Sequence, residues 1–259
     1  MKLIDCSASI VIYNNPEKMI RSAIETFLSC TLKVELHIVD NSPTDALKSL
    51  LADLPVEYHF FGSNAGYGRG HNLAVKESQD SKYHVIINPD IIIAPSTIET
   101  LFRFMEENSD IGIVSPKVLN EDGSIQYLNK RYPTVFDLFV RRFVPKPLHR
   151  LIKHRIDRYE MKDVGYEEIC DVECISGCFM FCRSEILKAV GGFDDRYFMY
   201  FEDFDLSRKI RQRGYRTVYY PYVTVTHLWE RESHKRIKMT WVFIVNMFRY
   251  FSKWGWVWF

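Results

Sequence analysis

The chain has 259 residues, of which 47% are hydrophobic and 26% charged, and its formal net charge at pH 7 is only +1. Such a composition is that of an ordinary globular protein, and no whole-chain positive field points to nucleic acid. Six cysteines in a chain of this size do not suggest a disulfide scaffold, and reduced thiols are typical of the cytoplasm. The N-terminal stretch lacks the features of a secretory signal, and no apolar run reaches the ~18 residues of a membrane span. We therefore expect a protein that is soluble or lies on a membrane surface.

Strand and helix signals alternate in the first half. The β-branched run ASIVIYN is followed by helical spacing over residues 16–29, by the strand VELHIVDNS and by a helix over residues 44–52. A third strand, VEYHFFGSN, leads through a glycine-rich turn into another helix, and YHVIINPD is a fourth strand. This order predicts an α/β fold with a Rossmann-like, mostly parallel central sheet and helices on both faces.

Polar clusters follow the predicted strands. Because ligands bind at the carboxyl ends of the strands in such sheets, these clusters are candidate binding residues. They are Tyr13 to Asn15, Asp40 to Ser42, Asn64 to Asn72, and Asn88 to Asp90.

The second half is less regular. We expect strands and a turn over residues 110–130, a basic stretch at 141–158, a strand at 172–182 and a helix over 184–190. A further helix should end at Arg213, with Gly214 as its stop, before a pair of strands in YRTVYYPYVTVTHL.

Four cysteines recur at every fourth residue, at positions 170, 174, 178 and 182. A metal cluster is one interpretation. Zinc sites usually place CxxC pairs on turns, whereas this stretch is apolar, so we favour small buried thiols on one face of a strand.

Asp90 ends a predicted buried strand directly after a proline. An acid there can cap the next element or bind a divalent cation, and Asp40 has the same two readings. The three glycines of NAGYGRGHN suggest a backbone that approaches a ligand closely, with a simple turn as the alternative. Their position and spacing differ from the dinucleotide fingerprint GxGxxG.

Three carboxylates, Glu202, Asp203 and Asp205, lie within the aromatic run YFMYFEDFDL. The helix dipole favours negative charge at a helix start, which explains one of them as a plain cap. A carboxylate beside an aromatic wall has a raised proton affinity, and that suits a general base. His227 ends a later strand and is either a core residue or a metal ligand.

Six segments in this order resemble family 2 inverting glycosyltransferases of the GT-A fold, especially the bacterial rhamnosyltransferase-like branch. They are SIVIYNN, IVDNS, NAGYGRGHN, INPD, the long segment from SGCFMFC to RQRG, and VTHLWERES, and they span about residues 9–229. The resemblance implies a GT-A fold and transfer of a sugar from a nucleotide donor to a hydroxyl group.

The resemblance also implies roles for single residues. Asp40 matches the acid that recognises the donor's base, with Tyr13 in the same pocket, and the 64–72 loop, including Asn64, Gly66, Arg69 and Asn72, matches the donor-lining segment. Asn88 and Asp90 match the DxD element, with Asn88 replacing its first acid. Asp90 and His227 would bind Mg²⁺ or Mn²⁺, and Asp203 matches the catalytic base. Glu202, Asp205, Ser176 and Gly177 would orient the base or shape the acceptor site.

The resemblance favours L-rhamnose from dTDP-L-rhamnose as the donor, with a UDP-hexose as the nearest variant. The alternative function, from another class of protein, is a catalytically silent glycan- or nucleotide-binding module. The missing GxGxxG argues against a Rossmann-type reductase.

The C-terminal segment 235–259 has five basic residues, no acids and dense Trp and Phe. It suits an interfacial membrane helix, or else a helix that packs on the domain or in a homodimer. The basic stretch 141–158 could dock on the same membrane surface or contact the diphosphate of an acceptor, with a solvated charged face as the alternative. We thus expect a glycosyltransferase domain over 1–230, with a nucleotide-sugar half at 1–110 and an acceptor half at 111–230, and a membrane-associating amphipathic segment at 231–259. These features are typical of a peripheral enzyme on the inner face of the cell membrane that acts on a lipid-linked glycan in O-antigen or capsule synthesis.

Overall fold

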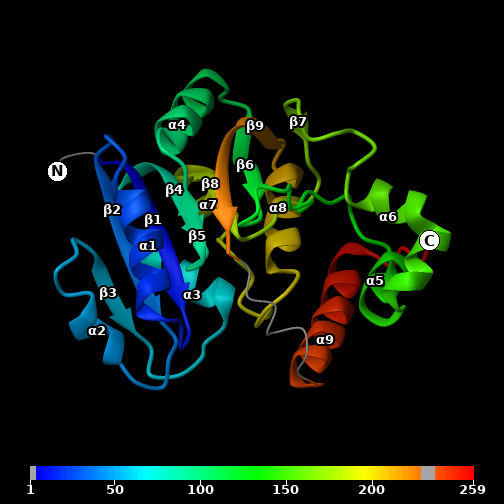
Figure 1. The fold of residues 1–259 in the computed structure, drawn as a ribbon, viewed down its shortest axis with the longest axis horizontal. Coiled ribbons are helices and arrows are strands. Elements are labelled where there is room, and N and C mark those ends of the chain that lie inside the picture. The colour runs from blue at the N-terminus through cyan, green and yellow to red at the C-terminus, as the bar shows by residue number, and fades with distance from the viewer. Residues whose placement is uncertain (1–3, 229–236) are drawn as a thin grey trace.

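A computed structural model describes residues 4–228 and 237–259, so the expected boundary at residue 230 lies outside the described residues. One mixed sheet runs through it in the order β3-β2-β1-β4-β8-β6-β9-β5, and β7 pairs with β9 (Figure 1). The strands are β1 (Ile4–Ile12), β2 (Val34–Asp40), β3 (Glu57–Phe60), β4 (Ser81–Ile87), β5 (Ile91–Ile93), β6 (Ile111–Leu119), β7 (Cys170–Asp171), β8 (Phe179–Arg183) and β9 (Arg216–His227). The helices are α1 (Glu17–Leu28), α2 (Ala46–Leu50), α3 (Tyr67–Glu77), α4 (Thr97–Glu107), α5 (Val135–Phe143), α6 (Lys153–Tyr159), α7 (Ser184–Ala189), α8 (Glu202–Gln212) and α9 (Ile237–Trp254), with the 3₁₀ helix η1 (Lys146–Ile152).

The first half folds as the sequence predicts. Strands β3, β2, β1 and β4 are all parallel. Helix α1 buries residues 20, 23, 24 and 27, which is the spacing of one helix face. Because side chains alternate along a strand, Val85 and Ile87 of β4 face one core, while Ile86 faces the core beneath α7 and α8. Helices therefore cover both faces of the sheet.

The sheet is mostly parallel as expected, but strand β8 runs antiparallel to β4 and β6. The second half corrects two expectations. The strand expected at 172–182 is confined to β8, because the backbone before it bonds elsewhere: Ile175 donates to the hydroxyl of Ser207. The expected pair of strands at 215–228 is the single strand β9, whose register against β6 shifts after Tyr220.

The four cysteines consequently do not share one strand face. Cys174 and Cys178 lie in the segment between β7 and β8, and Cys182 lies in β8. All three are buried free thiols.

The C-terminal helix α9 packs on the domain beside α5, at the end of the molecule opposite β3 (Figure 1). Its buried side chains, Tyr250 and Phe251, join a cluster with Leu138 of α5 and with Tyr197 and Phe201. The expected amphipathic helical segment is thus present. Within the described ranges, no helix has the length and apolar character needed to cross a bilayer.

Candidate active site

The candidate site lies at one edge of the sheet. Strands β1, β2 and β4 are parallel and end there with Ile12, Asp40 and Ile87. Strand β8 is antiparallel to β4 and starts at the same edge, where the amide of Asn88 donates to the carbonyl of Cys178 over 2.9 Å. Strand β9 runs in the direction of β4, so its last residue, His227, reaches the same edge. The topology therefore brings together residues that lie far apart in the sequence.

The side chains of Asp90 and His227 face each other at this edge of the sheet. The carboxylate Oδ2 of Asp90 lies 3.3 Å from Nε2 of His227, and the backbone amide of Leu228 donates to the Asp90 carbonyl over 2.9 Å. The side chain of Gln126 holds the histidine: its Nε2 donates to the His227 carbonyl, and its Oε1 lies 2.9 Å from the imidazole Nδ1. Since a carbonyl oxygen only accepts, Nδ1 donates to Gln126, and Nε2 is the ring nitrogen that faces Asp90.

A divalent cation suits this pair. Asp90 Oδ2 and His227 Nε2 lie 3.3 Å apart, close to the spacing of about 3 Å between neighbouring ligands of an octahedral ion. The buried Oδ1 atoms of Asn88 and Asp90 find no hydrogen-bond partner within the described part of the chain. No three His, Cys, Asp or Glu side chains gather as a metal-binding group in those same ranges, so the protein supplies few ligands. Mg²⁺ commonly binds through one or two carboxylates, substrate phosphates and water, and this donor set matches that pattern.

Asp203 lies in the first turn of α8. Its Oδ2 accepts a hydrogen bond of 3.1 Å from the amide of Gly177, and its Oδ1 accepts one of 2.9 Å from the amide of Phe204. Burial raises the pKa of the Asp203 carboxyl to about 6, against the lowering effect of these backbone donors. A carboxylate with this pKa is ionised at neutral pH and accepts a proton readily, as a general base must.

Glu202, the buried neighbour of Asp203, differs from it in protonation state. Its side chain is 6% exposed, and Oε2 has no hydrogen-bond partner among the described residues. Burial first, and then the charge of Asp203, raises the pKa of the Glu202 carboxyl well above its ordinary value. Glu202 therefore keeps its proton while Asp203 is charged. The two residues before it, Tyr200 and Phe201, have φ of 71° and 70°, a strained conformation that is found mostly at functional sites.

Tyr67 links the two sides of the site. Its hydroxyl donates to the carbonyl of Gly177 over 2.5 Å. The pKa of this phenol is raised well above its ordinary value, mainly by burial and then by neighbouring acidic groups that include Glu202, Asp203 and Asp90. This half-buried ring therefore contacts the same residue, Gly177, whose amide binds the candidate base. Gly177 lies between Tyr67 and Asp203, and the neighbouring Ser176 hydroxyl accepts from the Cys178 amide over 3.4 Å.

The glycines of the 64–72 loop serve packing. A Cβ at Gly66 would lie 2.7 Å from the carbonyl of Phe198, at Gly68 2.7 Å from Phe193 and at Gly70 2.7 Å from Val11. These glycines let α3 approach β1 and the segment before α8, so the expected close approach is made to protein atoms.

The polar residues Asn64, Arg69 and Asn72 of this loop differ in their surroundings. The amide of Asn72 is fully used by the 193–195 turn, where it donates to the Phe193 carbonyl and to Asp195 and accepts from the Phe193 amide. The structure therefore does not present Asn72 to a donor. Asn64 caps the amide of Gly66 over 3.1 Å, and Arg69 is exposed.

Asp40 and Tyr13 lie at the neighbouring strand ends. Asp40 is fully buried, and its carboxylate accepts from the hydroxyl of Tyr58 on β3 and from the amide of Ser42 over 2.7 Å. Tyr13 is 48% exposed directly after β1. The amide of Asn14 donates to Ser42, which joins the two strand ends.

Asp205 is the one acid of the trio that points away from this site. It is fully buried and accepts hydrogen bonds from Lys253 and Trp254 of α9. Its contacts are structural, so the expected orienting or acceptor role is not supported by its position.

Sequence reasoning missed Tyr58, Tyr67 and Gln126. Tyr67 stands inside the glycine-rich motif, which is a usable signal. Tyr58 and Gln126 occur in a short strand and after a turn, and no local pattern marks either one.

The fold and this constellation define a glycosyltransferase of the GT-A fold. The family model "Glycosyl transferase family 2" matches residues 7–191, and the chain belongs to that family. The chain is similar to rhamnosyltransferases, as the motifs predicted. It is 25% identical over 212 residues to the N-acetylglucosaminyl-diphospho-decaprenol L-rhamnosyltransferase of Mycobacterium tuberculosis, covering 75% of this chain and 66% of that protein. It is 25% identical over 225 residues to the rhamnosyltransferase WbbL of Escherichia coli K12, covering 84% of this chain and 81% of that protein.

Solved structures support the fold. GalNAc-T7, crystallised with UDP, GalNAc and Mn²⁺, matches with a TM-score of 0.66 at 16% identity, over 89% of this chain and 44% of that one. The mannosyltransferase PcManGT from Pyrobaculum calidifontis, in complex with GDP-Man and Mn²⁺, matches with a TM-score of 0.62 at 17% identity, over 90% of this chain and 59% of that one. Both of these structures contain Mn²⁺ together with a nucleotide or nucleotide sugar.

Proposed function

We propose that this glycosyltransferase moves L-rhamnose from dTDP-L-rhamnose to a hydroxyl of a lipid-linked glycan, in the synthesis of a bacterial surface polysaccharide such as O-antigen or capsule. The observation that carries the chemistry is Asp203, a base with a pKa of about 6 at the same sheet edge as Asp90 and His227. The rhamnosyl donor and the lipid-linked acceptor are supported by the names of the two relatives.

In the proposed reaction, Asp203 takes the proton of the acceptor hydroxyl. The acceptor oxygen forms a bond to the anomeric carbon while the bond from that carbon to the diphosphate oxygen breaks, and the nucleoside diphosphate leaves with the electron pair. A single displacement of this kind inverts the anomeric centre. The amides of Gly177 and Phe204 hold the carboxylate in place, and the protonated Glu202 avoids a second negative charge beside it.

Asp90 and His227 would hold Mg²⁺ or Mn²⁺, with Gln126 fixing the imidazole tautomer. When bound, the cation would stabilise the negative charge of the leaving diphosphate. Asp40, Tyr58 and Tyr13 would receive the base of the donor.

A UDP-hexose is the second candidate donor, because the GalNAc-T7 neighbour was solved with UDP. A silent binding module is disfavoured, since a half-buried carboxylate with a raised pKa costs stability and serves no structural contact except two backbone bonds.

The experiment is thermal unfolding with dTDP-L-rhamnose, UDP-glucose, UDP-galactose or UDP-GlcNAc, each with and without Mn²⁺, followed by transfer assays with the best donor. A donor at 100 times its Kd should add roughly 2.7 kcal/mol to the free energy of unfolding. Metal-dependent stabilisation by dTDP-L-rhamnose supports the proposal. Stabilisation by a UDP-sugar alone would identify that sugar nucleotide, instead of dTDP-L-rhamnose, as the donor. Transfer activity of Asp203→Asn equal to that of the wild type would overturn the assignment of Asp203 as the base.

A further inference from the structure

We propose that the outer face of α9, the C-terminal residues 255–259 and α5 together form a surface that docks on an anionic lipid bilayer. We call it the lipid-facing surface. The inference concerns binding rather than chemistry, so its test does not depend on which sugar the enzyme transfers.

Helix α9 is apolar on two faces. Its inner face supplies Tyr250 and Phe251 to the buried cluster under α5. On the outer face, Trp241 is 67% exposed and Phe248 is 51% exposed, and their spacing of seven residues puts both on one side of the helix. A surface helix of a globular protein normally keeps its outer face polar, so this face is adapted to another apolar medium.

The C-terminal residues extend this apolar face to α5. The ring of Phe248 lies 5.2 Å from Trp256, which stacks on Trp258 at 5.4 Å. The backbone carbonyls of residues 257 and 258 accept hydrogen bonds from the first two amides of α5. The ring of Phe259 lies 5.7 Å from Phe136 of α5. The segments 135–143 and 237–259 are distant in sequence and are joined here into one surface.

Helix α5 continues the aromatic stripe. Phe136, Phe139 and Phe143 share one helix face, and the last two are 53% and 46% exposed. Directly after α5, in η1, Leu148 and Leu151 are 51% and 82% exposed. The basic stretch noted in the sequence therefore carries large exposed apolar side chains as well as charge.

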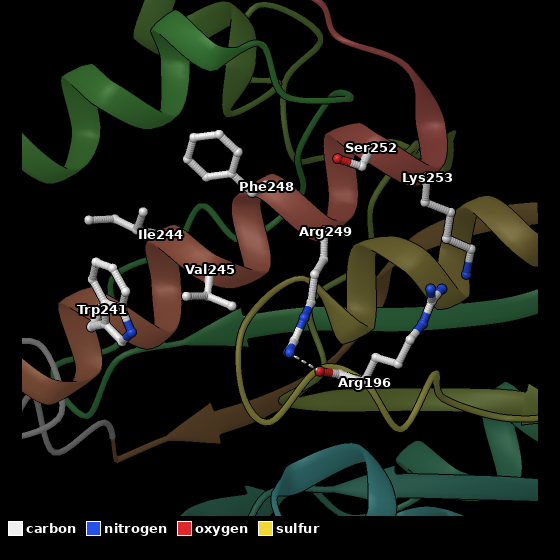
Figure 2. A pocket seen from close by; sticks show the side chains of 8 residues that line it. All are labelled: Arg196, Trp241, Ile244, Val245, Phe248, Arg249, Ser252 and Lys253. Atoms are coloured by element: carbon white, nitrogen blue, oxygen red, sulfur yellow. Dashed lines mark hydrogen bonds between the residues drawn. The ribbon is translucent and has the colours of Figure 1, made fainter.

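Positive charge lines this surface. A groove of about 550 Å³ on α9 has Trp241, Ile244 and Phe248 on its apolar side and Arg196, Arg249 and Lys253 on its cationic side (Figure 2). Arg196 and Lys253 also pair with Asp194. Among the described residues, Arg249 donates to two neutral oxygens, those of the Arg196 carbonyl and the Asn246 side chain, so these contacts do not neutralise its charge. An apolar strip beside cations matches the acyl chains and phosphates of an anionic lipid.

A bilayer suits this surface better than a second copy of the chain. The segment 237–259 contains Lys238, Arg249 and Lys253 and no acidic residue. A two-fold dimer through this face would bring these cations toward their own copies, which is repulsive. Trp and Tyr are the side chains that favour the depth of lipid headgroups.

The lipid-facing surface is fixed relative to the catalytic centre. Lys253 and Trp254 at the end of α9 both bind Asp205, which lies two residues after Asp203 in the same helical turn. A bilayer on this surface would therefore hold Asp203 at a set position above the membrane, on its cytoplasmic side. This last step rests on the proposed lipid-linked acceptor.

The test is co-sedimentation of the purified full chain with vesicles of phosphatidylcholine alone or mixed with phosphatidylglycerol, without donor or acceptor. We expect binding to the anionic vesicles and weak binding to the neutral ones. The double variant Trp258→Ser/Phe259→Ser, at the exposed chain end, should reduce partition by roughly tenfold or more. Arg249→Gln should reduce it about fivefold. The matched control is Tyr222→Ser, since Tyr222 is 60% exposed, close to the 59% of Trp258, but lies on β9.

Three results would overturn the proposal: no binding to anionic vesicles, wild-type binding by the Trp258/Phe259 variant, or an equal loss in the Tyr222 control. A stable dimer in solution that the double variant converts to a monomer, without vesicle binding by either, would assign the surface to a homodimer instead. Failure of the donor assays would leave the vesicle result unaffected, so the two proposals fail independently.

Discussion

The indole Nε1 of Trp254 donates a hydrogen bond of 2.8 Å to Oδ1 of Asp205. Lys253 donates to the other carboxylate oxygen over 2.9 Å, so two adjacent residues of α9 satisfy a fully buried acid on α8. This contact explains both the third carboxylate of the acidic trio and the aromatic residues around it. The carboxylate anchors α9, and Tyr197 and Phe201 form the wall against which the helix packs.

We expect Asp205→Ala to lower the free energy of unfolding by about 2 to 3 kcal/mol, because it leaves the Trp254 and Lys253 donors without their acceptor. Donor binding should persist, since the hydrogen bonds of Asp203 come from Gly177 and Phe204 and not from α9. Denaturant unfolding and nucleotide titration measure the two effects.

The control for this variant is Asp80→Ala, which removes an exposed acid that pairs with Lys188 at 3.3 Å. Its effect should stay within about 0.5 kcal/mol. If Asp205→Ala and Asp80→Ala lowered the free energy of unfolding equally, Asp205 would not be the residue that anchors α9.

Much of the first half of the chain could be predicted from the sequence, because its signals are local. Alternating β-branched runs, helical spacing and polar residues after each strand identify β1, β2, β4 and the helices between them. The mixed pairing of β8 and β9 could not be predicted in this way, since strand direction depends on partners distant in the chain. The separation of Asp205 from Asp203 also depends on a contact with α9 almost fifty residues away.

The transfer rate should rise with pH through about 6 and then level off. Burial raises the pKa of Asp203 to about 6, and the base works only in its ionised form. Below that pH the rate should fall about tenfold per unit. The measurement is kcat/KM between pH 5 and 8 at saturating metal. A rate that stays constant down to pH 5 would exclude Asp203 as the titrating base.

Asp203→Asn should be inactive yet more stable at neutral pH. The folded state holds the Asp203 pKa at about 6, above its ordinary 3.8, so the fold favours the protonated form and ionisation costs stability. This cost is absent below about pH 4, grows as pH rises through 6, and reaches up to about 3 kcal/mol. Asparagine carries no charge but loses one backbone hydrogen bond, so we expect a net gain of about 1 to 2 kcal/mol at pH 7.

Measuring the free energy of unfolding of this variant and of the wild type, at pH 7 and at pH 4, tests whether the substitution stabilises the protein. The gain should vanish at pH 4, where Asp203 itself is neutral. A variant that is destabilised at pH 7 would contradict a raised pKa.

Residues that position others were the hardest to predict. Asn72 matches a donor-binding motif but bonds to the turn at 193–195, and Gln126 matches no motif but holds His227. A motif records which residues occur together, whereas a hydrogen bond through the fold depends on where two loops meet. Only the structure shows such pairs.

Gln126→Leu should weaken metal binding without unfolding the protein. Its Oε1 lies 2.9 Å from Nδ1 of His227 and fixes a proton there, so Nε2 is the ring nitrogen that would bind a cation beside Asp90. Loss of such a partner typically reduces metal affinity about 10- to 100-fold. We therefore expect the Mn²⁺ concentration for half-maximal stabilisation by a nucleoside diphosphate to rise by that factor. The matched control is Gln79→Leu, an exposed glutamine near the end of α3, which should leave the metal titration unchanged. An unchanged titration in Gln126→Leu would mean that His227 does not bind the metal, and His227→Ala would then be expected to titrate like the wild type.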